Sequence, residues 1–141
     1  MTAVLLLARL FLAGLFLYAG LVKAGASEQF AVTIAQFTIL PPTFVGWAAA
    51  LLPFLEITAA VLLVLPATAR YGTWLIATLL TIFILSIGWA LSQGLIVDCG
   101  CFGESTPSHT KMLLALVRDV GLLILTVGLA VRQVPERTPR N

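Results

Sequence analysis

The sequence predicts an all-α integral membrane protein: a four-transmembrane-helix bundle with a short interfacial helix between the first and second spans. Two observations lead to this fold class. First, 60% of the 141 residues are hydrophobic and only 10% are charged, whereas a soluble domain carries about 25% charged residues. Second, the apolar residues fall in runs of roughly 20, the length at which a helix crosses a bilayer. The net charge of only +2 also excludes the strongly basic surface that nucleic-acid binding requires.

Four apolar runs define the predicted spans, and each contains few charged residues. They cover residues 4–22, 44–65, 73–91 and 112–131. We assign residues 1–132 to one membrane domain and residues 133–141 to a polar tail. Pro53 interrupts the second run, and we expect a kink there because proline removes a backbone hydrogen bond inside a helix.

The connections between the spans carry signals of helix boundaries. Residues 27–39 space their apolar side chains as an amphipathic helix does, but they are too few to cross a membrane. They therefore predict a helix at the interface, with Ser27 as its N-cap. Gly94 predicts the end of the third span, in the left-handed conformation. Thr106 and Pro107 predict the start of the fourth span, as N-cap and first helical residue.

Positive charges predict how the bundle is oriented. Four spans place both termini on one side, and that side carries five arginines against two lysines, Lys23 and Lys111, on the other. The arginines are Arg9, Arg70, Arg132, Arg137 and Arg140. The positive-inside rule then places both termini in the cytoplasm and the loop after the third span outside. Ala24-Gly25-Ala26 resembles a signal-peptide cleavage site, but Arg9 lies inside the apolar run, so we expect this segment to remain as the first span.

Both cysteines of the chain lie in Cys99-Gly100-Cys101, within the loop after the third span. Residues two apart can form a disulfide when the backbone turns, and Gly100 permits the turn. Such a small ring closes almost no loop and is strained, so it suits a labile redox pair better than a structural link. Asp98 disfavours a thiolate, whereas Lys111 and the start of the fourth helix favour one. Which cysteine attacks is therefore left open.

Two other interpretations of this segment are kept. The cysteines could simply pack in the loop, or Cys99, Cys101 and His109 could bind a metal with Asp98 or Glu104 as a fourth ligand. The spacing fits structural zinc poorly, which leaves a soft ion such as Cu(I). His109 is the only histidine, and it is either a proton acceptor near the thiols or a solvated residue at the interface.

Four ionisable residues fall within apolar runs: Arg9, Glu56, Arg118 and Asp119. At about 1.5 Å per residue, Glu56 lies roughly 13 Å from the cytoplasmic edge and Arg118 roughly 10 Å below the outer edge. We therefore predict that Glu56 pairs with Arg118, with Asp119 and Arg9 as further members of the network. Such charges either fix the register of the helices or mark a functional site. Lys23 is expected to reach the outer surface or to approach the cysteine loop.

Several of these segments together resemble a known family. They are Gly20-Leu21-Val22-Lys23 at the end of the first span, Leu52-Pro53-Phe54-Leu55-Glu56 in the second, Cys99-Gly100-Cys101-Phe102-Gly103 in the loop and Arg118-Asp119 in the last span. Over residues 4–131 the chain resembles the DoxX superfamily, and specifically its MauE (methylamine utilisation) branch.

The resemblance implies a multi-pass protein of the bacterial inner membrane with a role in thiol–disulfide chemistry outside the cytoplasm. It also implies an extracytoplasmic thioredoxin-like partner (MauD-like) and the maturation of disulfide-containing proteins, with Cys99 and Cys101 as the redox pair. Other branches of the superfamily include thiosulfate:quinone oxidoreductase, so quinone is the one cofactor that the resemblance suggests. Direct quinone contact would need an apolar groove between helices near the cysteine loop.

The main hypothesis is therefore a thiol–disulfide redox protein of the inner membrane, whose cysteine pair exchanges with a thioredoxin-like partner. One alternative is a soft-metal (copper) binding or transfer protein, and another is a non-catalytic anchor subunit of an oxidoreductase complex. The sequence leaves open whether the chain is itself an enzyme. Supporting roles are expected for the ionisable residues near the loop or inside the spans: Lys23, Glu56, Asp98, His109, Arg118 and Asp119.

Overall fold

The computed structural model describes residues 2–97 and 106–133, and five α-helices make up most of this part of the chain. They are α1 (Thr2–Gly25), α2 (Ser27–Gln36), α3 (Pro42–Val64), α4 (Ala69–Ser92) and α5 (His109–Gln133). Within the described residues, α1, α3, α4 and α5 are long and apolar enough to cross a membrane. The predicted class, an all-α bundle of four transmembrane helices, is confirmed.

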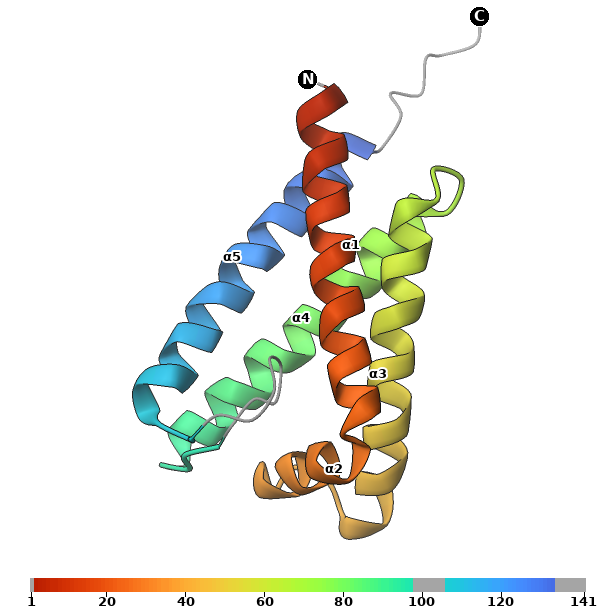
Figure 1. Cartoon of the computed structure of the whole chain (residues 1–141). Helices are drawn as coiled ribbons and strands as arrows, with labels where there is room; N and C mark the ends of the chain where they lie inside the picture. Colours follow the sequence, from red (N-terminus) through yellow and green to blue (C-terminus); the bar gives the residue numbers. More distant parts are fainter. Residues whose placement is uncertain (1, 98–105, 134–141) are drawn as a thin grey trace, which may run out of the picture.

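The helices pack in the order α1, α3, α4, α5, each mainly against the next (Figure 1). Helix α1 makes only a few direct contacts with α5. The start of α1, the α3–α4 connection and the end of α5 lie together at one end of the bundle, which we call the terminal end. The opposite end, where α4 ends and α5 begins, is called the loop end.

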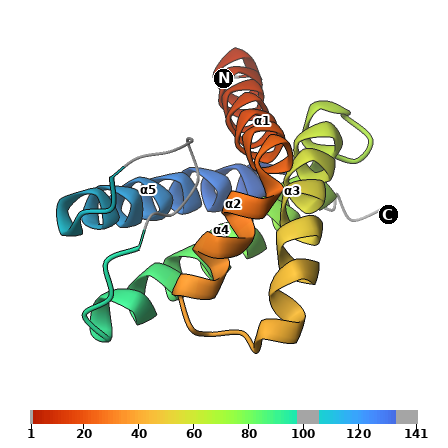
Figure 2. The same ribbon diagram turned by 60° about the horizontal axis from the view of Figure 1, so that its bottom comes forward.

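Helix α2 lies at the loop end and runs across the bundle (Figure 2). It forms where the amphipathic pattern predicts a helix, with Phe30 and Thr33 buried and its acidic residue Glu28 exposed. Its N-cap is Ala26 rather than the predicted Ser27, and no side chain caps it. The helix is confirmed, while its position at a membrane interface stays a prediction.

The other helix boundaries follow the predicted signals with one shift. Gly94, which follows the C-cap Gln93 of α4, has a positive φ of 69°, as predicted. Helix α5 begins at His109 rather than at Pro107, and the Ser108 hydroxyl accepts the backbone N–H of Lys111 at 3.2 Å. Ser108 therefore caps the helix in the way that was predicted for Thr106.

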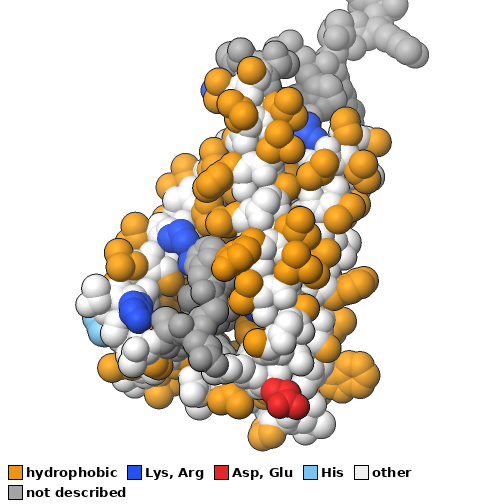
Figure 3. All heavy atoms as spheres, in the orientation of Figure 1, with side chains coloured by type: hydrophobic (Ala, Val, Ile, Leu, Met, Phe, Trp, Pro, Cys, Tyr) orange, Lys and Arg blue, Asp and Glu red, His pale blue; other side chains and the backbone are white. Residues whose placement is uncertain are grey.

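One apolar cluster in the interior of the bundle is drawn from all four long helices. Its buried members are Leu12, Ala13, Phe16, Ala59, Ala60, Leu63, Ile76, Leu79, Leu80, Leu122 and Leu129. Large apolar side chains also cover the outside, for example Phe11, Phe54, Leu85 and Ile124. Figure 3 shows hydrophobic side chains spread over the face turned to the viewer, with few charges among them. Such a surface suits contact with lipid rather than with water.

Arg9 does not join the predicted network around Glu56. Its guanidinium donates to the Leu63 carbonyl at 2.8 and 3.3 Å and to the Val64 carbonyl at 3.4 Å. These carbonyls belong to the last turn of α3, which has no basic residue of its own. Arg9 thus supplies a positive charge and donors where helix carbonyls lack partners.

We expect Arg9→Met to lower the free energy of unfolding by about 1–2 kcal/mol, because charged hydrogen bonds to these carbonyls are lost. The measurement is SDS-induced unfolding from detergent micelles, followed by far-UV circular dichroism. The control is Arg70→Met, which removes an exposed arginine at the same end of the bundle. Equal losses for the two variants would contradict the capping role.

Candidate functional site

The structure describes the residues on both sides of the predicted redox segment but not the segment itself. Asp98, Cys99, Cys101 and Glu104 lie outside the described residues. On one flank, buried Val97 donates its backbone N–H to the Met112 sulfur at 3.2 Å. On the other, the Lys111 ammonium donates to the Thr106 carbonyl at 3.0 Å. Both contacts involve the first turns of α5, so both flanks of the cysteine segment are held at the loop end.

A second apolar cluster fixes the first of these flanks. Val97 packs with Ile87 and Ala90 of α4 and with Met112 and Ala115 of α5, all of them buried. Phe37, which follows α2, packs against the same cluster. The base of the cysteine loop therefore rests on three helices rather than on one.

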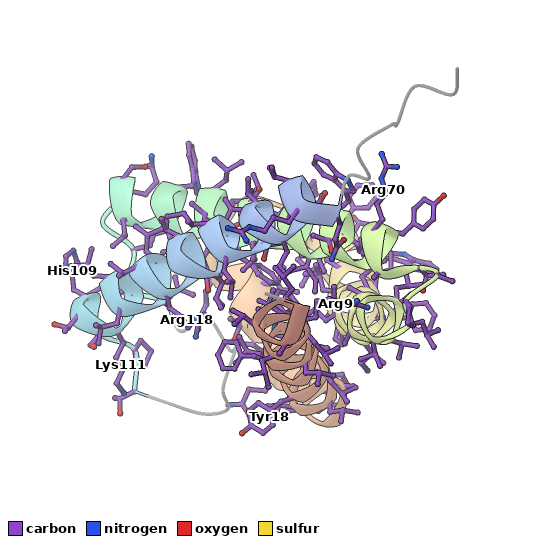
Figure 4. All side chains as sticks on the ribbon, turned by 90° about the horizontal axis from the view of Figure 1, so that it is seen from above. Arg9, Tyr18, Arg70, His109, Lys111 and Arg118 are labelled. Atoms are coloured by element: carbon purple, nitrogen blue, oxygen red, sulfur yellow. The ribbon has the colours of Figure 1, made fainter. Side chains whose placement is uncertain are left out.

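His109 is the first residue of α5, and it is exposed. Figure 4 shows the His109 and Lys111 side chains on different sides of the start of this helix. Among residues 2–97 and 106–133, no group of three or more His, Cys, Asp or Glu side chains could hold a metal ion. The two cysteines of the metal hypothesis lie outside these ranges, so that hypothesis is not tested.

Lys23 and Glu56 form an ion pair inside the bundle. The Lys23 ammonium lies 2.5 Å from Glu56 Oε1, and both side chains are 1% exposed. The same ammonium lies 4.5 Å from the ring centre of Phe83 and 5.2 Å from that of Phe30. Residues of α2, α3 and α4 thus surround one lysine of α1. Lys23 neither reaches the surface nor contacts a described flank of the cysteine loop.

The predicted pairing of Glu56 with Arg118 is therefore wrong. The carboxylate of Glu56 accepts from Lys23, while the Arg118 guanidinium donates to Oδ1 of its neighbour Asp119 at 2.8 and 2.9 Å. The prediction counted Lys23 as an outer-surface residue, but α1 continues to Gly25 and α2 covers that end of it. The four side chains do meet at a common level, because all of them line one small cavity.

Gly20 explains why α1 can approach α3 so closely at this point. A Cβ at position 20 would lie 2.8 Å from Ile57 Cγ1, 3.0 Å from the Pro53 carbonyl oxygen and 3.2 Å from Glu56 Cβ. Gly20 and Lys23 are three residues apart and share a helix face, as do Pro53 and Glu56. In the sequence, the first span carries a glycine three residues before Lys23, and the second carries a proline three residues before Glu56. These two equal spacings are the sequence signal that could have predicted the Lys23–Glu56 pair.

The cavity between the two ion pairs has a volume of about 30 Å³. Leu15, Phe16, Ala19, Leu80, Phe83 and Leu122 complete its lining. Glu56 Oε2 and Asp119 Oδ2 are both buried, and neither has a hydrogen-bond partner among the described residues. Each carboxylate is thus paired through one oxygen and left with a second oxygen that no described donor reaches.

A larger apolar groove of about 190 Å³ lies between α2, α3 and α4. Its lining consists of Phe30, Thr33, Ile34, Phe37, Ile39, Leu40, Leu52, Ile82, Phe83, Ser86 and Ile87. It lies at the loop end, since Ile87 also belongs to the cluster that holds Val97. Apart from Thr33 and Ser86, all of these residues are apolar. Quinone binding itself stays a prediction.

Comparison with known protein families shows which family this chain belongs to. The model of the family described as methylamine utilisation protein MauE matches residues 1–132. The chain belongs to the MauE family. It is 33% identical over 123 residues to the methylamine utilization protein MauE of Methylorubrum extorquens and to that of Paracoccus denitrificans. In both cases the match covers 86% of this chain and 66% of the relative.

The MauE of Methylophilus methylotrophus is 28% identical over 128 residues, which are 90% of this chain and 67% of that protein. The chain thus spans about two thirds of the length of these MauE proteins. No solved structure matches it. With four helices that are long and apolar enough to cross a membrane, this MauE-family chain is a multi-pass membrane protein.

Proposed function

We propose that this MauE-family chain is a membrane accessory protein of methylamine utilisation that works by thiol–disulfide exchange. The observation that supports the proposal concerns the residues on either side of Cys99-Gly100-Cys101 in the sequence: Val97 and Thr106 both bond to the first turns of α5. A chain whose two cysteines lie two residues apart, between flanks fixed at one end of a bundle, is suited to offer them to a soluble partner.

The proposed exchange proceeds in two balanced steps. A thiolate of the partner attacks one sulfur of the Cys99–Cys101 disulfide, the S–S bond breaks, and a mixed disulfide forms while the other cysteine leaves as a thiolate and takes up a proton. The partner's second thiolate then attacks the mixed disulfide and releases the remaining cysteine. The partner is oxidised to a disulfide and the pair is reduced to two thiols. The relative reduction potentials decide whether this direction or its reverse is favoured.

The proposed location is the bacterial inner membrane, with both termini in the cytoplasm and the cysteine pair outside. Arg9 near the start of α1, Arg70 at the start of α4 and Arg132 in the last turn of α5 lie toward the terminal end (Figure 1). At the loop end, Lys111 is exposed and Lys23 is buried in an ion pair. The positive-inside rule supports the cytoplasm for the arginine-rich end. The opposite compartment is the one in which disulfides persist.

The proposal predicts that one single-cysteine variant traps a partner. Cys99→Ser and Cys101→Ser are each incubated with a thioredoxin-like protein whose two active-site cysteines form a disulfide, which the remaining thiolate of the variant attacks while one partner cysteine leaves as a thiolate. We expect one of them to accumulate a mixed disulfide, because the cysteine that would resolve it is missing. Non-reducing electrophoresis and mass spectrometry of the linked peptides measure it. The double variant Cys99→Ser/Cys101→Ser is the control and gives no such species.

Other outcomes would replace this proposal. If neither single variant traps a partner and the pair stays reduced in cells, as shown by alkylation, the exchange role is lost. Binding of Cu(I) by the reduced pair, without a mixed disulfide, would favour the soft-metal alternative. Full support of methylamine growth by the double variant would favour the non-catalytic anchor.

A further inference from the structure

The small cavity between the two ion pairs contains buried carboxylate oxygens that lack hydrogen-bond donors among the described residues, and the proposed thiol exchange does not involve them. All four long helices contribute to its lining, and two cations and two carboxylates meet around it. Within the described part of the chain, Glu56 Oε2 and Asp119 Oδ2 are buried without a donor. Carboxylate oxygens buried in an apolar interior are strongly unfavourable unless something donates hydrogen bonds to them.

The size of this space fits a water molecule. A site needs about 10–15 Å³ of such volume to hold one water, together with two to four polar partners. The cavity offers about 30 Å³. Two oxygens lack donors, and a water molecule has two O–H groups to donate. A water molecule in this space therefore supplies the kind of donor that these oxygens lack.

We propose that this cavity is a binding site for one or two water molecules that bridge Glu56 Oε2 and Asp119 Oδ2. The bridge joins the Lys23–Glu56 pair to the Asp119–Arg118 pair and makes them one network of zero net charge. It also links α3 to α5 in a bundle whose α1 and α5 make few direct contacts. Water between intramembrane carboxylates is the kind of connection from which proton relays are built.

The site requires no cysteine, so its test is separate from the test of thiol exchange. The full chain with Cys99→Ser/Cys101→Ser is placed in lipid bilayers with ¹³C-labelled Glu, Asp and Ile, and magnetisation transfer from water is followed by solid-state NMR. We expect water to reach the side-chain carboxyls of Glu56 and Asp119 several-fold faster than the buried Ile76 methyl groups. Exposed Glu28 is the fully hydrated reference, and Glu56→Gln assigns the Glu56 signal.

Ala19→Val provides the matched variant, because Ala19 lines the cavity and carries no charge. Its added methyl groups fill the space, and we expect water transfer to both buried carboxyls to fall to the Ile76 level while Glu28 is unaffected. Transfer to Glu56 and Asp119 in the parent chain that is as slow as transfer to Ile76 would overturn the proposal. That result decides the question even if Ala19→Val fails to fold.

Discussion

Replacing Glu56 by leucine should lower the free energy of unfolding by about 3–5 kcal/mol, the loss seen when one partner of a buried ion pair is removed. The Lys23 ammonium would be left buried without its ion-pair partner, with the ring centres of Phe83 and Phe30 at 4.5 and 5.2 Å. Cation–π contacts return about 2 kcal/mol even when desolvated, which is less than the cost of an unpaired buried charge. Lys23→Met should have an effect of similar size, because it leaves the carboxylate alone.

The double variant Lys23→Met/Glu56→Leu tests whether the loss of stability comes from an unpaired buried charge. Replacing both charges by apolar groups of similar size removes the unpaired ion, and such replacements are often neutral or stabilising. We therefore expect it to be more stable than either single variant. SDS-induced unfolding in micelles, followed by tryptophan fluorescence and circular dichroism, gives the four free energies of a double-mutant cycle.

The control for this cycle is Glu28→Gln, which removes an exposed carboxylate on α2 and should change stability by no more than about 0.5 kcal/mol. If the two single variants each lost less than about 1 kcal/mol, as exposed ion pairs do, the pair would have to be hydrated. If the double variant were as unstable as the sum of the single variants, the two side chains would not be coupled.

The spans were predictable because one physical requirement dominates them. A helix in lipid needs about 20 apolar residues whatever it packs against, and so runs 4–22, 44–65, 73–91 and 112–131 correspond closely to α1, α3, α4 and α5. The observed helices extend a few residues beyond most of these runs. Polar residues such as Gln133 continue the helix at the terminal end, where hydropathy gives no signal but backbone hydrogen bonds still favour helix.

The pairing of the charges was not predictable in the same way, because depth along a span does not specify the helix face. Lys23 follows the first apolar run and was expected at or near the outer surface, yet Phe30 of α2 covers it and Glu56 pairs with it. Arg9 and Glu56 were placed in one network, but Arg9 caps the end of α3 instead. The close approach at Gly20 decides these partners, and it depends on tertiary packing.

The second large effect is expected where α4 crosses the end of α3 at Gly72. A Cβ at this position would lie 2.5 Å from the Leu63 backbone nitrogen, 2.8 Å from Leu63 Cα and 2.9 Å from the Leu62 carbonyl carbon. These are backbone atoms of a helix, which cannot rotate away as a flexible side chain can. The two helices must therefore separate or shift before any larger residue fits.

Gly72→Ala should accordingly lower the free energy of unfolding by about 1–3 kcal/mol, the usual cost of overpacking. The matched control is Gly88→Ala in the same helix, where a Cβ would meet nothing within 4 Å and where alanine improves helix propensity. Gly20→Ala should fall between the two, because its closest contact is the side-chain atom Ile57 Cγ1. The same SDS titration ranks all three variants.

This ranking separates close packing from helix propensity as the reason for the glycines. Propensity alone predicts that all three alanine variants are at least as stable as the parent, since alanine is the better helix former at each site. Packing predicts the order Gly88→Ala, Gly20→Ala, Gly72→Ala from most to least stable. An order in which Gly72→Ala matches Gly88→Ala would show that α3 and α4 can separate without cost. The backbone contact at Leu63 would then not be what holds the α3–α4 hairpin together.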